Sequence, residues 1–172
     1  MDGDPRFPLH HRSEVVLAVE PDRLFAHLDD HRRLASHMEK PSLMTAGASM
    51  RIETDERRGQ APGSVIRMTG RVLGLDLWLE EVVTTYEPPR QKVWETRGEP
   101  RLLLIDQYQM GFTIDPVPQG SRLVVFIDFQ LPQQGVGRVL GLLLGRGYAA
   151  WCTRRMAQDA RAVFGAKAQA RA

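Results

Sequence analysis

Two carboxylates fall on the apolar side of predicted strands. In the strand predicted over residues 75–83, leucine and valine alternate with other residues, and Glu81 shares their side. In the long strand predicted over residues 101–114, Asp106 shares one side with Leu102, Leu104, Tyr108, Met110 and Phe112. A carboxylate that faces an apolar interior costs several kcal/mol unless it is paired, protonated or hydrated. The pattern therefore predicts an apolar cavity that holds a few polar groups.

In such a cavity, Glu81 and Asp106 would orient a ligand or act as a general acid or base with a raised pKa. Tyr108, and His37 on a predicted short helix, complete the set of candidate catalytic residues. A β-bulge would reverse these faces and place either carboxylate in water, because side chains alternate with a period of two. Pairing with an arginine of the C-terminal helix is the other structural explanation. The spacing alone leaves these alternatives open.

Other reactive sites find little support in the sequence. The five histidines show no metal-binding spacing, so we expect no metal and no cofactor. The single cysteine, Cys152, excludes a disulfide framework, and its place on an apolar helix face predicts a packed thiol. Neither a G-x-S-x-G motif nor a glycine-rich phosphate loop is present.

The composition fits one soluble domain. The 172 residues are 42% hydrophobic and 26% charged, with 23 Lys and Arg against 21 Asp and Glu. A net charge of +2 without a basic stripe argues against nucleic-acid binding. No apolar run approaches the ~20 residues of a membrane span, and the N-terminus lacks a signal-peptide pattern. We therefore expect a cytoplasmic protein without stable membrane insertion.

The pattern of elements predicts an α+β domain over residues 13–165. A mobile arm is expected over residues 1–12 and a disordered Ala-rich tail over residues 166–172. A first strand at 13–19 precedes two short helices, the first beginning at Pro21 and the second spanning 31–39. Five or six strands then follow between residues 46 and 131, and their short connections require antiparallel pairing.

A long helix is predicted from Val136 to Phe164. Its apolar residues fall four apart and should face the sheet: Leu140, Leu144, Tyr148, Cys152 and Met156. Glycines also recur every four residues along its first half, at Gly137, Gly141 and Gly145. They favour either close approach to the sheet or room for a ligand. Transient contact of the leucine-rich segment with a bilayer is a third interpretation.

The chain resembles the SRPBCC (START-like, polyketide cyclase/dehydrase) superfamily over roughly Ser13 to Phe164. The matching stretches are Pro21-Asp22-Arg23-Leu24-Phe25-Ala26 followed by Asp29-Asp30-His31, then Glu80-Glu81-Val82-Val83-Thr84 leading to Glu87-Pro88-Pro89, and the terminal helix. These motifs mark a helix start, a strand and a turn. The resemblance implies a helix-grip fold, in which a curved antiparallel sheet wraps around the long C-terminal helix and encloses an apolar cavity. Combined with the strand faces, it predicts these ligand-binding residues: Met68, Leu79, Trp94, Tyr108, Met110, Phe112, Phe129, Tyr148 and Cys152.

The resemblance implies binding or transport of a small hydrophobic or lipid-like ligand in that cavity. Binding is the first expectation and catalysis the second, because a fold alone does not assign a reaction. The alternative is a polyketide cyclase/dehydratase-like enzyme whose cavity acids direct a condensation or a loss of water. A protein-interaction module is a second alternative. Trp78 and Phe126 lie opposite the main apolar faces of their strands, which predicts an exposed patch through which a homodimer would form.

Overall fold

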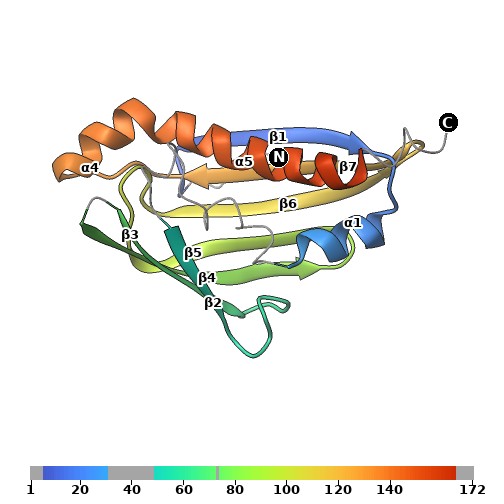
Figure 1. Cartoon of the computed structure of the whole chain (residues 1–172), viewed down its shortest axis with the longest axis horizontal. Helices are drawn as coiled ribbons and strands as arrows, with labels where there is room; N and C mark the ends of the chain where they lie inside the picture. The colour runs from blue at the N-terminus through green and yellow to red at the C-terminus, as the bar shows by residue number, and fades with distance from the viewer. Residues whose placement is uncertain (1–5, 31–48, 73, 166–172) are drawn as a thin grey trace.

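The computed structural model describes residues 6–30, 49–72 and 74–165 (Figure 1). Its elements, in chain order, are β1 (Leu9–Leu17), α1 (Pro21–Leu28), β2 (Ser49–Thr54), β3 (Val65–Val72), β4 (Leu75–Glu87), β5 (Gln91–Arg101), β6 (Tyr108–Val117), β7 (Gly120–Phe129), α4 (Gly135–Leu140), η1 (Gly141–Gly145) and α5 (Arg146–Phe164). The predicted second short helix at 31–39 and the predicted tail at 166–172 lie outside the described residues.

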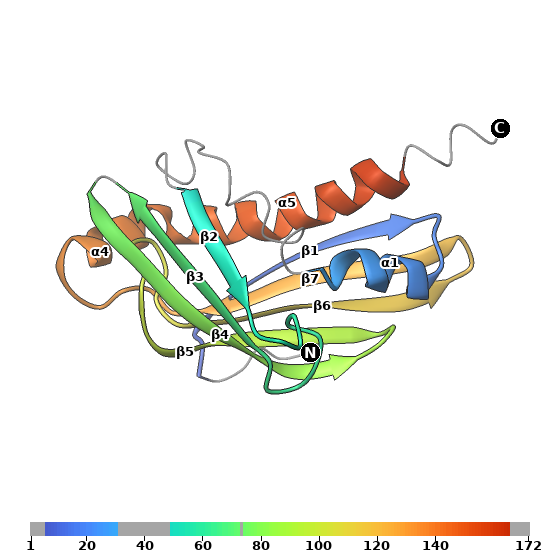
Figure 2. The same cartoon turned by 60° about the horizontal axis from the view of Figure 1, so that its bottom comes forward.

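The seven strands form one antiparallel sheet in the order β1-β7-β6-β5-β4-β3-β2. The chain meanders from β2 to β7 through short connections, and β1 then pairs with β7 at the far edge. The sheet twists strongly, so β2 and β3 cross the direction of β6 and β7 (Figure 2). The long C-terminal helix lies along one face and packs mainly on β1 and β7. The predicted helix-grip fold is thereby confirmed.

The first strand begins at Leu9, so the expectation of a mobile arm is wrong for residues 9–12. The reason is that both faces of β1 find partners. His11 and Ser13 reach the hydroxyl of Thr153 on α5, at 2.8 and 3.0 Å. On the other face, His10 forms a short hydrogen bond with Asp128 of β7.

The long strand predicted over residues 101–114 is interrupted. Arg101 ends β5 and Tyr108 begins β6, with a loop between them. The loop is held to the end of β7, because the Asp106 amide donates to the Gln130 carbonyl and the Gln130 amide donates to the Gln107 carbonyl, both at 2.9 Å. The alternation that placed Asp106 with Tyr108 therefore fails, and Asp106 does not lie on a strand.

The C-terminal helix has a different inner face from the predicted one. Cys152 and Met156 are buried as expected, but Tyr148 is only half-buried and Leu144 is 52% exposed. A π-helical turn, η1, contains one residue more than an α-helical turn. The residues before it therefore point in a different direction, relative to those of α5, from the one that a spacing of four predicts. The glycines take the inner positions instead of the leucines. A Cβ on Gly145 would lie 2.6 Å from the Leu104 carbonyl oxygen.

The predicted exposed patch of Trp78 and Phe126 is also wrong, because both residues are half-buried. Phe126 lies on the outer face of the sheet against Gly111, where a Cβ would come within 3.0 Å of its ring. Two further apolar residues, Phe7 and Val93, are buried at 7% and 5% exposure, so they do not extend such a patch either.

A buried ion pair joins α1 to the sheet. The Lys92 ammonium on β5 is fully buried and donates to Asp29 Oδ1 at 2.7 Å and to the Asp29 carbonyl oxygen at 3.0 Å. The Tyr86 hydroxyl on β4 donates to Asp29 Oδ2 at 2.8 Å. Asp29 caps the C-terminal end of α1, so these bonds fix that end of the helix over β4 and β5.

Replacement of Lys92 by methionine should destabilise the protein by about 3 to 5 kcal/mol, because it leaves the Asp29 carboxylate buried without its cation. The double variant Lys92→Met/Asp29→Asn should recover part of that loss, since no unpaired buried charge remains. The matched control is Arg67→Met, which breaks the exposed pair with Glu80 and should cost at most about 1 kcal/mol. Urea unfolding midpoints measure all three. A loss for Lys92→Met no larger than that of the control would contradict the prediction.

Substitution of Gly145 tests whether the helix packs directly on the sheet end or lines open space there. A Cβ at this position would also lie 2.6 Å from Leu131 Cδ2, so Gly145→Ala should destabilise by about 1 to 3 kcal/mol through overpacking, and Gly145→Leu by more. Gly147 is the control, since a Cβ there meets no atom within 4 Å and alanine gains about 1 kcal/mol of helix propensity. Denaturant midpoints should move in opposite directions for the two alanine variants. A stabilised Gly145→Leu would indicate open space at this position.

Candidate functional site

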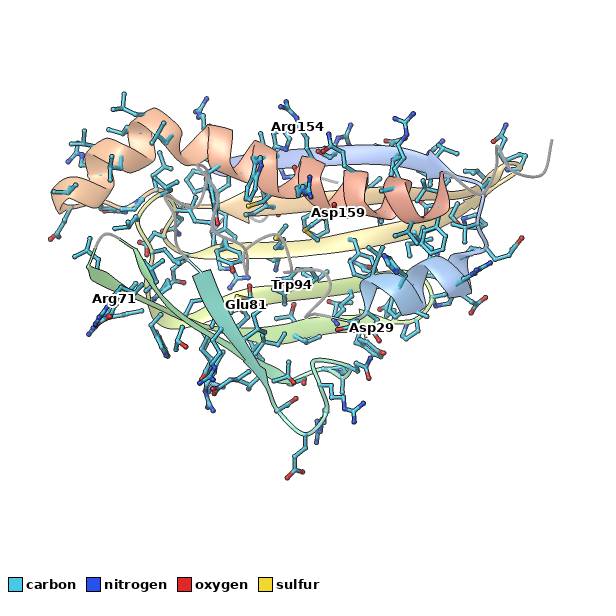
Figure 3. The ribbon with its side chains drawn as sticks, in the orientation of Figure 1. Asp29, Arg71, Glu81, Trp94, Arg154 and Asp159 are labelled. Atoms are coloured by element: carbon cyan, nitrogen blue, oxygen red, sulfur yellow. The ribbon has the colours of Figure 1, made fainter. Side chains whose placement is uncertain are left out.

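Glu81 and Tyr108 meet on the inner face of the sheet, although they belong to strands that are not neighbours. Glu81 on β4 is 1% exposed, and the Tyr108 hydroxyl on β6 donates to Glu81 Oε1 in a short hydrogen bond. Figure 3 shows Glu81 and Trp94 on the sheet, below the long helix. The prediction that Glu81 faces the interior is confirmed.

Thr96 on β5 occupies the space between these two strands. It is paired with Glu81 in the β4–β5 register, and its hydroxyl bonds to the backbone of Tyr108. Thr96 Oγ1 accepts from the Tyr108 amide at 3.0 Å and donates to the Tyr108 carbonyl at 3.3 Å. These bonds hold the start of β6 against β5, where the interrupted strand would otherwise leave two backbone groups unsatisfied. They also fix the position from which the Tyr108 side chain reaches Glu81.

The helix α5 contributes two further polar groups from above. Tyr148 and Cys152 lie one helical turn apart on α5. Both groups interact electrostatically with Tyr108 across the space between helix and sheet, and Tyr148 also interacts with Glu81. We call Glu81, Tyr108, Tyr148 and Cys152 the inner polar cluster.

Burial sets the protonation of the cluster's hydroxyl and thiol groups. Burial, reinforced by the nearby Glu81 carboxylate, raises the pKa of Tyr108 well above its ordinary value. Burial likewise raises the pKa of Tyr148, with a smaller contribution from Cys152. The pKa of the Cys152 thiol rises to about 12 for the same reason. At neutral pH the tyrosines are therefore neutral donors, and the thiol is not the thiolate that nucleophilic catalysis requires.

The nine residues predicted to bind a ligand lie in the hydrophobic core that surrounds this cluster. Eight of them are buried and Tyr148 is half-buried at its edge. The inner polar cluster thus places neutral hydroxyl groups and one carboxylate among apolar side chains. Such an arrangement can hydrogen-bond one polar group of an otherwise apolar molecule and fix its orientation.

Two of the candidate catalytic residues do not join the cluster. Asp106 lies half-buried in the loop between β5 and β6, and burial raises the pKa of its carboxyl. Within the described ranges, no hydrogen bond or ion pair joins its side chain to Glu81 or Tyr108. His37 lies outside the described residues.

Sequence reasoning missed the polar residues that support the site. Lys92 and Thr96 share the inner side of β5 with Trp94, so the alternation around this tryptophan was the available signal. Asp29 directly follows the first helix, and the sequence pattern does not mark it as buried. Its role becomes visible once Tyr86 and Lys92 are known to face it.

Over the described part of the chain, no three His, Cys, Asp or Glu side chains come together in a way that could hold a metal ion. Among the same residues, no helix is both long and apolar enough to cross a membrane.

A family model described as "Polyketide cyclase / dehydrase and lipid transport" matches residues 9–163, which is nearly the whole described fold. The chain belongs to this family. The match spans all seven strands and ends one residue before the last residue of α5.

Solved structures share the fold at low sequence identity. The ZhuI aromatase/cyclase from Streptomyces sp. R1128 is 16% identical with a TM-score of 0.61, covering 92% of this chain and 97% of that one. A protein of Thermus thermophilus, TTHA0849, is 14% identical with a TM-score of 0.61, covering 90% and 99%. The di-domain aromatase/cyclase StfQ of the steffimycin biosynthetic pathway is 13% identical with a TM-score of 0.60, covering 93% and 52%. Among curated proteins no match is found. At these identities the likeness concerns the fold.

Proposed function

We propose that this member of the family binds a small, mostly apolar molecule between the sheet and α5. The molecule carries at least one hydroxyl or similar donor group, which the inner polar cluster hydrogen-bonds. The observation that carries the proposal is the bond from the Tyr108 hydroxyl to Glu81, inside a core that is otherwise mostly apolar. The family description, which includes lipid transport, supports the same class of ligand.

The division of labour between the apolar wall and the polar cluster follows from their energetics. Apolar contact supplies affinity at roughly 25 cal/mol for each Å² buried, but it does not distinguish one apolar molecule from another of similar size. Hydrogen-bonding groups supply the distinction, because a ligand that leaves a buried polar group unpaired loses about 1 to 3 kcal/mol. Burial keeps Tyr108 protonated, and its one hydroxyl hydrogen goes to Glu81, so its oxygen is what can accept a hydrogen bond from a ligand. The cluster would therefore select ligands that carry a donor such as a hydroxyl.

A second candidate function is an acid–base reaction on the bound molecule, such as a condensation or a loss of water. The specific observation in its favour is that a carboxylate and a phenol are bonded directly to one another, so a proton on either group has a partner. Glu81 would act as the base, and Tyr108 would polarise a carbonyl by turning its hydroxyl hydrogen from Glu81 to the substrate. The isolation of Asp106 removes one of the expected catalytic groups from this scheme.

Matched ligands test the binding proposal. 1-Naphthol and 1-methylnaphthalene have similar shape, but only the naphthol can hydrogen-bond. We expect both to displace an apolar fluorescent probe, and Tyr108→Phe to weaken 1-naphthol about five- to tenfold while leaving 1-methylnaphthalene unchanged. The control is Tyr86→Phe, which removes the tyrosine hydroxyl that donates to Asp29. It should leave the affinities for 1-naphthol and 1-methylnaphthalene unaltered.

Native mass spectrometry of the purified protein gives the complementary measurement, because a bound molecule adds its mass. An unchanged ligand after incubation supports binding alone, whereas a ligand lighter by one water supports the dehydration reaction. A protein that retains no molecule and binds neither the probe nor the naphthalenes would refute the proposed function.

A further inference from the structure

The first half of the long helix exposes an apolar surface that the fold does not cover. Five side chains on α4 and η1 are more than half exposed: Val136 at 74%, Val139 at 57%, Leu142 at 63%, Leu143 at 74% and Leu144 at 52%. We call these five residues the helix patch. Scattered exposed leucines are ordinary on protein surfaces, but a contiguous patch on one element marks a contact surface.

The orientation of this patch is fixed by close packing on the opposite side of the helix. A Cβ on Gly141 would lie 2.8 Å from Pro132 Cδ and 3.1 Å from the Leu104 carbonyl oxygen, and one on Gly145 would be closer still. The helix therefore cannot rotate to bring a leucine to this position without pushing backbone aside. The leucines point outward because the glycines must point inward, so their exposure belongs to the native packing.

The charged residues on this stretch of the helix all have the same sign. Between Asp128 and Asp159 the sequence contains four arginines and no acidic residue. Arg138 lies within the helix patch and Arg146 follows it directly, and both are exposed. Exposed leucines together with arginines on a surface helix are typical of helices that lie in the headgroup region of an anionic bilayer.

One more exposed apolar residue lies at the same end of the molecule. Leu75, the first residue of β4, is 53% exposed. Figures 1 and 2 both show the tip of the β3–β4 hairpin and α4 at one end, away from α1. This hairpin thus adds one apolar side chain at that end, beside the exposed ion pair of Arg71 and Asp76.

We propose that this end of the protein docks on the surface of an anionic bilayer, with the helix patch entering the headgroup region and Arg138 and Arg146 contacting lipid phosphates. The contact is shallow, because only six residues, Val139 to Leu144, form the apolar block between the two arginines and a span needs about 20. The inference goes beyond ligand binding, and membrane docking is measured without any ligand.

A second copy of the chain is the competing occupant of the patch. In a two-fold dimer built on this face, Arg138 and Arg146 of both copies would approach one another with no acidic residue on this part of the helix to neutralise them. Like charges brought together in this way oppose association. The charge pattern therefore favours a negatively charged surface.

Sedimentation with vesicles tests the proposal on the full chain. We expect binding to vesicles of phosphatidylcholine and phosphatidylglycerol, much weaker binding to phosphatidylcholine alone, and loss of the difference at high salt. Leu142→Ser/Leu143→Ser should weaken binding roughly tenfold or more. Val16→Ser/Val163→Ser, which changes two exposed valines elsewhere, should have no effect. Arg138→Gln/Arg146→Gln should weaken binding about fivefold per arginine at low salt. Arg12→Gln/Arg161→Gln is its control and should bind like the unaltered protein.

Circular dichroism and the urea midpoint establish that each variant is folded, which is expected because every substituted side chain is exposed. Binding that the leucine variant retains in full would overturn the proposal, as would absence of binding to anionic vesicles. Sedimentation equilibrium supplies the remaining outcome. A dimer that Leu142→Ser/Leu143→Ser dissociates, without vesicle binding, would show that the patch joins two copies and would also overturn it. None of these results bears on the naphthalene measurements, so the two proposals fail separately.

Discussion

The approach of the long helix to the end of the sheet depends on residues that have no side chain. Gly141 and Gly145 lie so close to Leu104 and Leu131 that a Cβ on either would crowd a neighbouring atom. This contact fixes the rotation of the helix about its axis. It turns Leu142 and Leu143 to the solvent, and the π-helical turn η1 then resets the phase so that α5 presents Cys152 and Met156 to the sheet. The placement of Tyr148 and Cys152 over the sheet and the exposure of the helix patch follow from the same contact.

Strand alternation predicted the inner face of the sheet well, up to the points where the ladder is irregular. In β4, the odd-numbered residues from Leu79 to Val83 are buried, and Glu81 is among them. A register shift lies between Val83 and Thr85, and beyond it the even-numbered Tyr86 faces Asp29. Another shift lies between Trp78 and Glu80, ahead of Glu81, but it leaves Glu81 on the buried side. The shift past Val83 is the one that brings Tyr86 inward.

The wrong predictions for Asp106 and Leu144 have local physical causes. A sequence period of two or four does not reveal them. Asp106 shares the parity of Tyr108, but backbone bonds to Gln130 and from it divert the chain into a loop. Leu144 shares the spacing of Cys152, but a helix with one π-turn no longer keeps a spacing of four on a single face. In both cases the deciding interaction is between backbone groups or with a glycine, where residue type gives little indication. The overall order of elements is robust because it depends on many residues at once.

The buried carboxylates of Asp29 and Glu81 have different neighbours. The difference indicates a structural role for Asp29 and a candidate functional role for Glu81. Asp29 receives the ammonium of Lys92 and the hydroxyl of Tyr86, which suits a carboxylate that anchors α1. Glu81 receives the hydroxyl of Tyr108, and Lys92 also interacts with it electrostatically without an ion-pair contact. Burial lowers the pKa of Lys92, and the carboxylates oppose that shift. The Lys92 ammonium thus pairs directly with Asp29 and interacts at longer range with Glu81. The anchor of α1 and the candidate ligand site are therefore electrostatically linked, and a change at Lys92 would be felt at Glu81 even where α1 remains in place.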